Sequence, residues 1–382
     1  MGDVFYKKVK MLVEDGRLSV QLLISPPRTC SSMLEHMIGK APEINAECHE
    51  PFIQVGCNKL DSDDGYKNIY EAIKLKGLEK SDGQFGVIVK EMSCWISDND
   101  EYKKLFNLTN NPIITLIRNP LLTMESRISK VIEATDMRER IKTQQWLLNY
   151  IAKEKGFNTW NDLVLIADGY FQKDNVLSIF ENINALKCAY DNPTLDIQNK
   201  LLDYVARKDG YGSWRQLLKD KLYINRDYPY FKDILEIDAK RFNLDVSGFV
   251  TMETQIAYLE SINKPFIVID ATDLRAKPEH QMREICRLLK ISYVDEMIIW
   301  GDEKIDFHTK QKRPHDLIWY SELYSSTRVN PPTEEIPLTL SEFPEFVRKF
   351  IKSIDLPAYA RLSQKKIGRE NEHNPNEFRG RP

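Results

Sequence analysis

The segment of residues 18–34 constrains the fold of this chain more than any other stretch. It reads LSVQLLISPPRTCSSML: an apolar run, a Pro-Pro-Arg turn, and small hydroxyl residues that open a helical pattern. A buried strand that leads through a turn into a helix N-terminus directs several backbone N–H groups at one point, where an anion can bind. The alternative is an ordinary strand-to-helix connection, in which Thr29 and Ser31 are only N-cap residues.

The turn differs from a Walker A loop, which needs a Gly-Lys-Ser/Thr sequence whose lysine reaches the terminal phosphates. In this chain Arg28 supplies the positive charge, and Thr29, Ser31 and Ser32 supply hydroxyl groups. The segment therefore indicates an anion site that uses arginine in place of the lysine.

Four short apolar runs are typical of buried parallel strands. They are residues 19–25, 86–90, 113–117 and 265–269, each rich in Val and Ile and followed by polar or turn residues. Helical patterns lie between them, for example at 31–38 and 279–289. The alternation predicts an α/β fold with a doubly wound, mainly parallel central sheet flanked by helices.

A long stretch, residues 135–261, separates the third predicted strand from the fourth. Helical periodicity dominates it, whereas a βα connection normally holds a few residues and one helix. We therefore predict a core of residues 1–134 and 262–362 with a large helical insertion at 135–261. The insertion either covers the substrate or packs its tryptophans, such as Trp160 and Trp214, in a core. Residues 363–382 are polar, basic and rich in Pro and Asn, so we expect a flexible tail.

Composition limits the classes of partner. The net charge of −3 argues against a nucleic-acid binder, which usually carries a basic excess. No apolar run approaches the roughly 18 residues of a membrane span, and the N-terminus lacks a signal-peptide core. We therefore expect a cytoplasmic protein with no membrane partner. The 6 cysteines lack CxxC spacing, which indicates neither a zinc site nor a disulfide framework.

A second arginine stands at the end of another predicted strand. The strand ends at Arg118, Pro120 opens a helix where its missing N–H costs nothing, and Ser126 lies about two turns further on. Ligands of open α/β sheets bind at the carboxyl ends of strands, and a planar guanidinium suits phosphate. Asp273, after the last predicted strand, is a landmark that equally fits a helix cap or a turn.

These segments resemble the sulfotransferases that use 3′-phosphoadenosine-5′-phosphosulfate (PAPS). Arg118 and Ser126 are similar to that family's 3′-phosphate site, and Asp273 with Leu274 is similar to its later acidic-Leu motif before a Pro-led helix. Residues 48–52 and 319–328 resemble segments of the bacterial and fungal branches. The residues similar to the family's 5′-phosphosulfate loop are Pro27, Arg28, Thr29, Cys30, Ser31 and Ser32.

The resemblance implies a P-loop-like fold and transfer of a sulfuryl group from PAPS to a hydroxyl or amine of a small-molecule acceptor. The second product would be 3′,5′-ADP, and no metal is expected. Cys30 stands where the family usually has glycine, so a positive φ at this position would be strained. Arg328 departs in the same way, since the family's Ser-Thr motif commonly continues there with glycine.

Sulfuryl transfer needs cations that stabilise the charge on the transferring group and the leaving phosphate. Arg28 on the loop and Lys90 at the end of the second predicted strand are the cations best placed, although Lys90 equally fits a solvated strand end. Lys312 and Arg313 would fold back onto the cofactor, or else simply face water as most charge runs do.

The reaction also needs a general base for the acceptor. Glu50 is the first candidate, because the resemblance places a glutamate there in one branch of the family. Glu91, beside Lys90, is the second, since other branches carry a histidine on that strand. His49 is the third, because its ordinary pKa suits a base although a lone histidine is more often structural. Each acid equally fits a simple ion pair with a neighbouring arginine.

Two other functions remain compatible with the sequence. One is a P-loop-like small-molecule kinase that uses ATP and Mg²⁺, although the chain lacks its Gly-Lys-Ser/Thr loop and a strand ending in a metal-binding Asp. The other is a non-catalytic nucleotide-binding protein in which Cys30 has spoiled the loop. The aromatic residues of the insertion suit an apolar or aromatic acceptor, or equally a core. A homo-oligomer is compatible with the sequence.

Overall fold

The computed structural model describes residues 3–56, 61–80, 83–96, 101–134, 137–159, 202–203, 205–212, 217, 247–303, 305, 320, 322–332, 339–343 and 345–367. The contacts divide the chain into two compact units. One comprises residues 1–127, 235–340 and 345–382, and the other comprises residues 128–234 with 341–344. Lys312, Arg313, the two tryptophans named above and most of the predicted tail lie outside the described residues.

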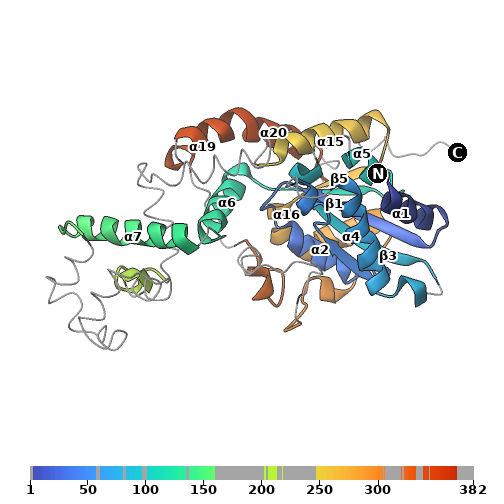
Figure 1. Ribbon diagram of the computed structural model, residues 1–382, viewed down its shortest axis with the longest axis horizontal. Helices are drawn as coiled ribbons and strands as arrows, with labels where there is room; N and C mark the ends of the chain where they lie inside the picture. The colour runs from blue at the N-terminus through green and yellow to red at the C-terminus, as the bar shows by residue number, and fades with distance from the viewer. Residues whose placement is uncertain are drawn as a thin grey trace. The chain divides into compact units, whose positions relative to one another are not determined.

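The first unit is built on five parallel strands in the order β2-β3-β1-β4-β5 (Figure 1). This arrangement confirms the predicted α/β class. All four predicted strands are present, and β2 is an additional strand that the sequence did not predict. The strands are β1 (Leu18–Ser25), β2 (Ala46–His49), β3 (Phe85–Met92), β4 (Ile113–Ile117) and β5 (Phe266–Asp270).

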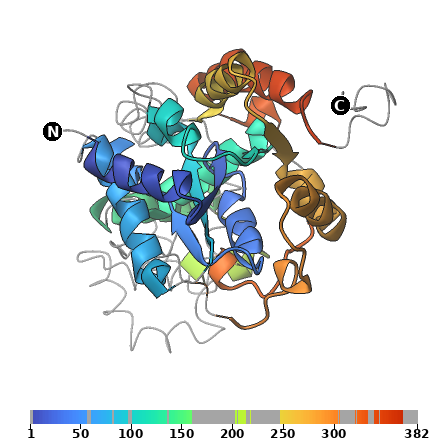
Figure 2. The ribbon, with the colours of Figure 1, turned by 90° about the vertical axis from the view of Figure 1, so that its right-hand side faces the viewer.

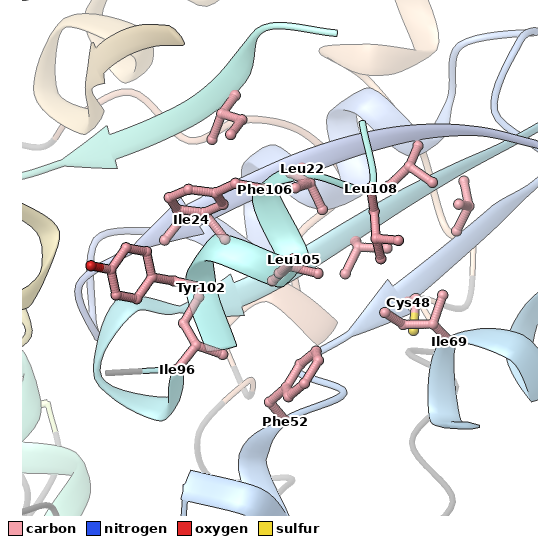
Figure 3. Close-up of a cluster of buried hydrophobic side chains, with 14 of the residues drawn as sticks. Leu22, Ile24, Cys48, Phe52, Ile69, Ile96, Tyr102, Leu105, Phe106 and Leu108 are labelled. Carbon is pink, nitrogen blue, oxygen red and sulfur yellow. The ribbon is translucent and has the colours of Figure 1, made fainter. Parts of the chain in front are cut away.

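Helices cover both faces of this sheet. Successive residues of a strand point to opposite sides, so each face presents apolar side chains that a helix layer buries. On one side, Leu22 and Ile24 of β1 join a core with α1 (Val4–Glu14), α4 (Ser62–Leu75) and α15 (Phe249–Ser261), part of which is drawn in Figure 3. On the other side, Leu23 joins a core with α2 (Ser31–Gly39) and α17 (Pro278–Leu289). Figure 2 shows α1 and α17 on opposite sides of the strands.

The helix α17 illustrates how the sequence sets an element. Pro278 occupies its first turn, where the missing N–H costs nothing. Met282, Ile285 and Leu289 follow at helical spacing and are all buried against the sheet. Lys290 ends the helix in a left-handed conformation with φ 58°.

Of the other helices of the described residues, α6 (Pro120–Ala134) and α7 (Met137–Glu154) are long and the rest are short. α6 begins in the first unit, and α7 lies in the second, where Leu147 and Ile151 are buried. The rest are α3 (Ile53–Gly56), α5 (Glu101–Phe106), α16 (Ala271–Ala276), α19 (Glu345–Phe350) and α20 (Leu356–Ser363), the 3₁₀ turns η1 (Leu78–Lys80), η2 (Ser93–Ile96), η3 (Asp295–Met297) and η4 (Leu340–Glu342), and the π-helix η5 (Ile351–Asp355).

Two details differ from the predicted organisation. The sequence assigned α15 to the insertion, but this helix packs in the core of the first unit, where Phe249 and Met252 are buried. Lys366 forms a β-bridge with Val268, and the Ile367 N–H donates to the Val268 carbonyl at 3.0 Å, so the chain adds to the outer side of β5. No helix among the described residues is long and apolar enough to cross a membrane.

Candidate functional site

The strand order places a topological switch point at the carboxyl ends of β1 and β4. The chain leaves β1 for the side of the sheet that holds β2 and β3, and leaves β4 for the side that holds β5. Connections that diverge from neighbouring parallel strands open a binding crevice outside their carboxyl ends. The turn of residues 26–30 follows β1, and Arg118 follows β4, so both predicted anion segments lie at this point.

The turn after β1 has a strained backbone. Arg28 and Cys30 both have φ 66°, and Cys30 is the N-cap of α2. The Thr29 hydroxyl donates to the Pro26 carbonyl at 2.9 Å and closes the turn. The positive φ of Cys30 is the conformation that favours glycine, as the sequence predicted for this position. Ser31 and Ser32 open α2, and the N-terminus of a helix is where backbone N–H groups can bind an anion.

The two anion segments contact each other directly. The Arg28 Nε donates to the Ser126 hydroxyl at 3.0 Å, and the Arg118 Nη1 donates to the Arg28 carbonyl at 3.2 Å. Arg118 is buried, and burial lowers the pKa of the Arg28 guanidinium. Two guanidinium groups and a hydroxyl from α6 therefore meet beside the turn.

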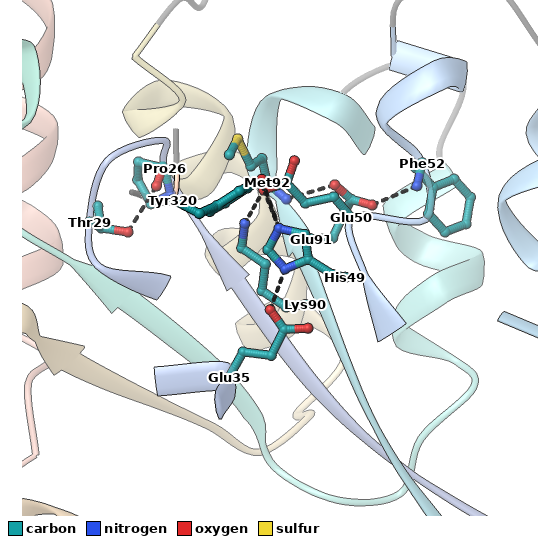
Figure 4. Close-up of polar contacts among 10 residues, drawn as sticks. All are labelled: Pro26, Thr29, Glu35, His49, Glu50, Phe52, Lys90, Glu91, Met92 and Tyr320. Atoms are coloured by element: carbon teal, nitrogen blue, oxygen red, sulfur yellow. Dashed lines mark hydrogen bonds and ion pairs between the residues drawn. The ribbon is translucent and has the colours of Figure 1, made fainter. Parts of the chain in front are cut away.

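A buried polar cluster lies at the carboxyl ends of β2 and β3 (Figure 4). His49 is paired in register with Lys90, and Glu50 continues from β2. Lys90 and the α2 residue Glu35 are both 0 % exposed. The Lys90 ammonium bonds Glu50 Oε1, and the His49 Nδ1 lies 2.5 Å from Glu35 Oε2. The cluster thus joins the strands β2 and β3 to the helix α2.

Tyr320 brings the C-terminal part of the unit to this cluster. Its hydroxyl lies 2.8 Å from the His49 Nε2 and 3.3 Å from Glu50 Oε1. The same Nε2 is 3.4 Å from Glu50 Oε1. The ring of Tyr320 also packs edge to face on the imidazole, with centroids 5.0 Å apart. Tyr320 belongs to the segment 319–328 that the sequence singled out.

The charges of the cluster compensate one another. Burial alone would raise the pKa of Glu50, but the cations Lys90 and His49 outweigh it and hold that pKa well below its usual range. Burial would lower the pKa of His49, but Glu35 and Glu50 outweigh burial and Lys90 and raise it to about 9. Burial raises the pKa of Glu35, and His49 opposes this change. Glu50 is therefore ionised and His49 protonated at neutral pH.

Glu91 does not join the cluster. As the neighbour of Lys90 on β3, it lies on the opposite face of the sheet. Its carboxylate accepts the Phe52 N–H at 2.7 Å and the Met92 N–H at 2.8 Å. Burial, together with the charge of Glu50, raises the pKa of Glu91 to about 8. Its contacts fix the turn that carries Glu50.

Backbone strain gathers at these strand ends. Five non-glycine residues of the described chain have a positive φ, and three of them are Arg28, Cys30 and Glu50, the last with φ 46°. The other two, Asn263 and Lys290, follow helix ends. Such conformations cost of the order of 1–3 kcal/mol and gather at functional sites. This observation marks the ends of β1 and β2 independently of any motif.

The sequence did not single out two residues that shape the site. Glu35 lies four residues after Ser31, and residues at this spacing share one face of a helix. This spacing could have indicated that Glu35 lies on the same side of α2 as the loop residue Ser31. Gly248, with φ 76°, lies against the loop: a Cβ built on it would be 3.0 Å from the Pro27 Cδ and 2.6 Å from the Ser93 hydroxyl. The Ser93 hydroxyl donates to the Gly248 carbonyl at 2.7 Å.

Comparison with protein-family models, with curated proteins and with solved structures gave no match for this chain. Within the described residues, no group of three or more His, Cys, Asp or Glu side chains is arranged to hold a metal ion.

Proposed function

We propose that the chain is a PAPS-dependent sulfotransferase of P-loop-like fold that acts on a small-molecule acceptor. The observation that carries the proposal is the meeting of Arg28, Arg118 and Ser126 at the carboxyl ends of β1 and β4. Phosphate groups at both ends of one nucleotide need cations from two separate segments, and these segments supply them. The connections diverge from β1 and β4 at this point, which supports the same proposal.

The surroundings of the turn also suit a phosphate-bearing ligand. Ser25, the last residue of β1, is fully buried, and its hydroxyl has no hydrogen-bond partner among the described residues. A buried hydroxyl without a partner is costly, and one at the base of an anion loop can be satisfied by a bound oxygen. The N-terminus of α2 and the two guanidinium groups add positive potential at the same point.

The residues of the cluster have distinct roles in this proposal. When bound, PAPS would supply the sulfuryl group and leave as 3′,5′-ADP, and Arg28, Arg118 and Ser126 would hold its phosphate groups. Glu50 is the ionised carboxylate of the cluster and would accept the proton of the acceptor hydroxyl or amine. Lys90, which bonds Glu50, would stabilise negative charge on the transferring group.

Binding of 3′,5′-ADP tests the proposal most directly. Calorimetry should detect binding of 3′,5′-ADP to the wild-type protein, and weaker binding of ADP, which lacks the 3′-phosphate. A hydrogen bond to a charged group contributes about 1.5–3 kcal/mol. Arg118→Ala should therefore raise the Kd for 3′,5′-ADP roughly 10- to 150-fold.

Arg283→Ala is the matched control, since this arginine is 56 % exposed on α17 and bonds Glu279. It should bind 3′,5′-ADP as the wild type does. Absence of binding to the wild type, or equal affinity for Mg²⁺-ADP, would refute the sulfotransferase proposal, and the second result would favour the kinase.

A further inference from the structure

The hydrogen bonds around His49 form a directed chain. The His49 Nδ1 lies 2.5 Å from Glu35 Oε2, and it is the donor when Glu35 is ionised, because a carboxylate only accepts. On the other side of the ring, Nε2 lies 2.8 Å from the Tyr320 hydroxyl, which lies 3.3 Å from Glu50 Oε1. Tyr320 has one hydroxyl proton, and it can be given either to Nε2 or to Glu50.

The protonation state of His49 decides between these two directions. A protonated ring donates from Nε2 to the Tyr320 oxygen, and the hydroxyl proton then points to Glu50. A neutral ring that keeps its proton on Nδ1 accepts at Nε2, and the hydroxyl proton turns away from Glu50. The direction of one hydroxyl therefore depends on a charge that lies on the far side of the imidazole.

We infer that Glu35 is a positioning residue that keeps His49 protonated and thereby directs the Tyr320 hydroxyl onto the carboxylate of Glu50. Glu35 bonds the Nδ1 side of the His49 ring, whereas Tyr320 and Glu50 lie at the Nε2 side, so Glu35 acts on them through His49. Its side chain is 0 % exposed, and its Oε1 has no hydrogen-bond partner among the described residues, so its contact with His49 is its main compensation for burial.

The charges that face His49 come from four elements. Glu35 lies on α2, Lys90 on β3, Glu50 at the end of β2, and Tyr320 in the C-terminal part of the unit. Of these, Glu35 and Glu50 favour the protonated ring, and Lys90 opposes it. Because Glu50 is already bonded to Lys90, the carboxylate of Glu35 decides the balance.

The inference deepens the proposed function and rests on it for its catalytic meaning. Under it, His49 is a fixed cation of the site, and Glu50 alone is left to take the acceptor proton. The Tyr320 hydroxyl and Lys90 then set how basic Glu50 is.

NMR titration of the full chain with ¹³C-labelled histidine and tyrosine tests the inference without any ligand. The His49 signal is assigned by its loss in His49→Gln, and the wild-type ring should titrate at about pH 9. In Glu35→Gln it should titrate about two pH units or more lower, a 100-fold loss of proton affinity, because burial and Lys90 then prevail. Glu47→Gln is the control, since Glu47 lies 3.8 Å from His36 and should leave the His49 titration in place.

A second measurement uses only the wild type, so it does not depend on the folding of a variant. The ¹³Cζ signal of Tyr320 should change at the same pH as His49, as the hydroxyl turns from Glu50 to Nε2. A His49 titration in Glu35→Gln within half a pH unit of the wild type would overturn the inference, as would a Tyr320 signal that stays constant while His49 titrates. Failure of the wild type to bind 3′,5′-ADP would refute the proposed function alone, because neither titration involves a nucleotide.

Discussion

Replacing Lys90 by methionine probes the buried cluster through protein stability. Lys90 is 0 % exposed, and its ammonium bonds the carboxylate of Glu50, which is 3 % exposed. Methionine keeps the length and the apolar stem of the side chain but removes the cation. Loss of one partner of a buried ion pair costs about 3–5 kcal/mol, because the remaining charge is uncompensated. His49 and Tyr320 still contact Glu50, so we expect the free energy of unfolding to fall by about 3 kcal/mol.

Urea unfolding followed by circular dichroism measures this loss. Thermal unfolding should show a fall in Tm of roughly 6–12 °C, at about 2–4 °C for each kcal/mol. The control is Lys74→Met, which removes an exposed pair with Glu79 at 3.3 Å and should cost less than about 1 kcal/mol. The combined variant Lys90→Met/Glu50→Gln should lose less stability than the two single losses added, since neither charge is then stranded.

The stability loss of Lys90→Met should also depend on pH, in a direction that the pKa of Glu50 determines. In the wild type the folded-state pKa of Glu50 is lowered, so its contribution to stability is present above its ordinary pKa and is lost as the pH falls through the folded value. Without Lys90, burial raises that pKa, and protonation of Glu50 relieves the stranded charge. The deficit of Lys90→Met should therefore shrink between pH 8 and pH 5. A deficit below about 1 kcal/mol at pH 7.5, or one that is equal at both pH values, would refute the reasoning.

The loop itself yields two further predictions. Cys30→Gly should stabilise the protein by about 1 kcal/mol in thermal unfolding, because glycine adopts φ 66° without strain. Cys30→Ala is the control, since alanine keeps the strain. Equal stability of the two variants would contradict this prediction. Gly248→Ala should weaken 3′,5′-ADP binding roughly tenfold or more, because its Cβ would displace Pro27 or Ser93. Gly210→Ala is the control for backbone strain alone, because Gly210 has φ 85° and nothing lies within 4 Å of a Cβ built on it. Wild-type affinity in Gly248→Ala would count against a role for the close approach of Gly248 to Pro27 and Ser93.

Apolar runs made four of the five strands predictable from the sequence, whereas the polar residues of β2 gave no strand pattern. The four predicted strands carry Val and Ile at buried positions, and their pattern is visible without tertiary structure. β2 reads Ala-Glu-Cys-His and has no apolar run. Its pairing with β3 stabilises it as a strand, and its last residue, His49, faces the polar cluster. Only the neighbouring strand identifies it as a strand.

The site residues that directly follow an apolar run were predictable from the sequence. Those whose orientation depends on the residue at which a strand ends were not. Arg28 and Arg118 each follow an apolar run, and the topology of a parallel sheet brings such positions together. The predicted second strand ended at Lys90, whereas β3 continues to Met92, and this extension turns Glu91 to the opposite face. Glu35 is a charged residue in an amphipathic helix, and its partner His49 lies on the strand that was not predicted.

The outermost named strands of this sheet are short. β1 and β3, with 8 residues each, occupy inner positions, while β2 with 4 and β5 with 5 are the outermost named strands. Unpaired outer strands invite other chains to add to a sheet, and short or covered ones resist this. The bridge from Lys366 to Val268 blocks part of β5 and places an ammonium 2.6 Å from Asp273 Oδ2. The same bridge that anchors the end of the described chain thus also guards the sheet against aggregation.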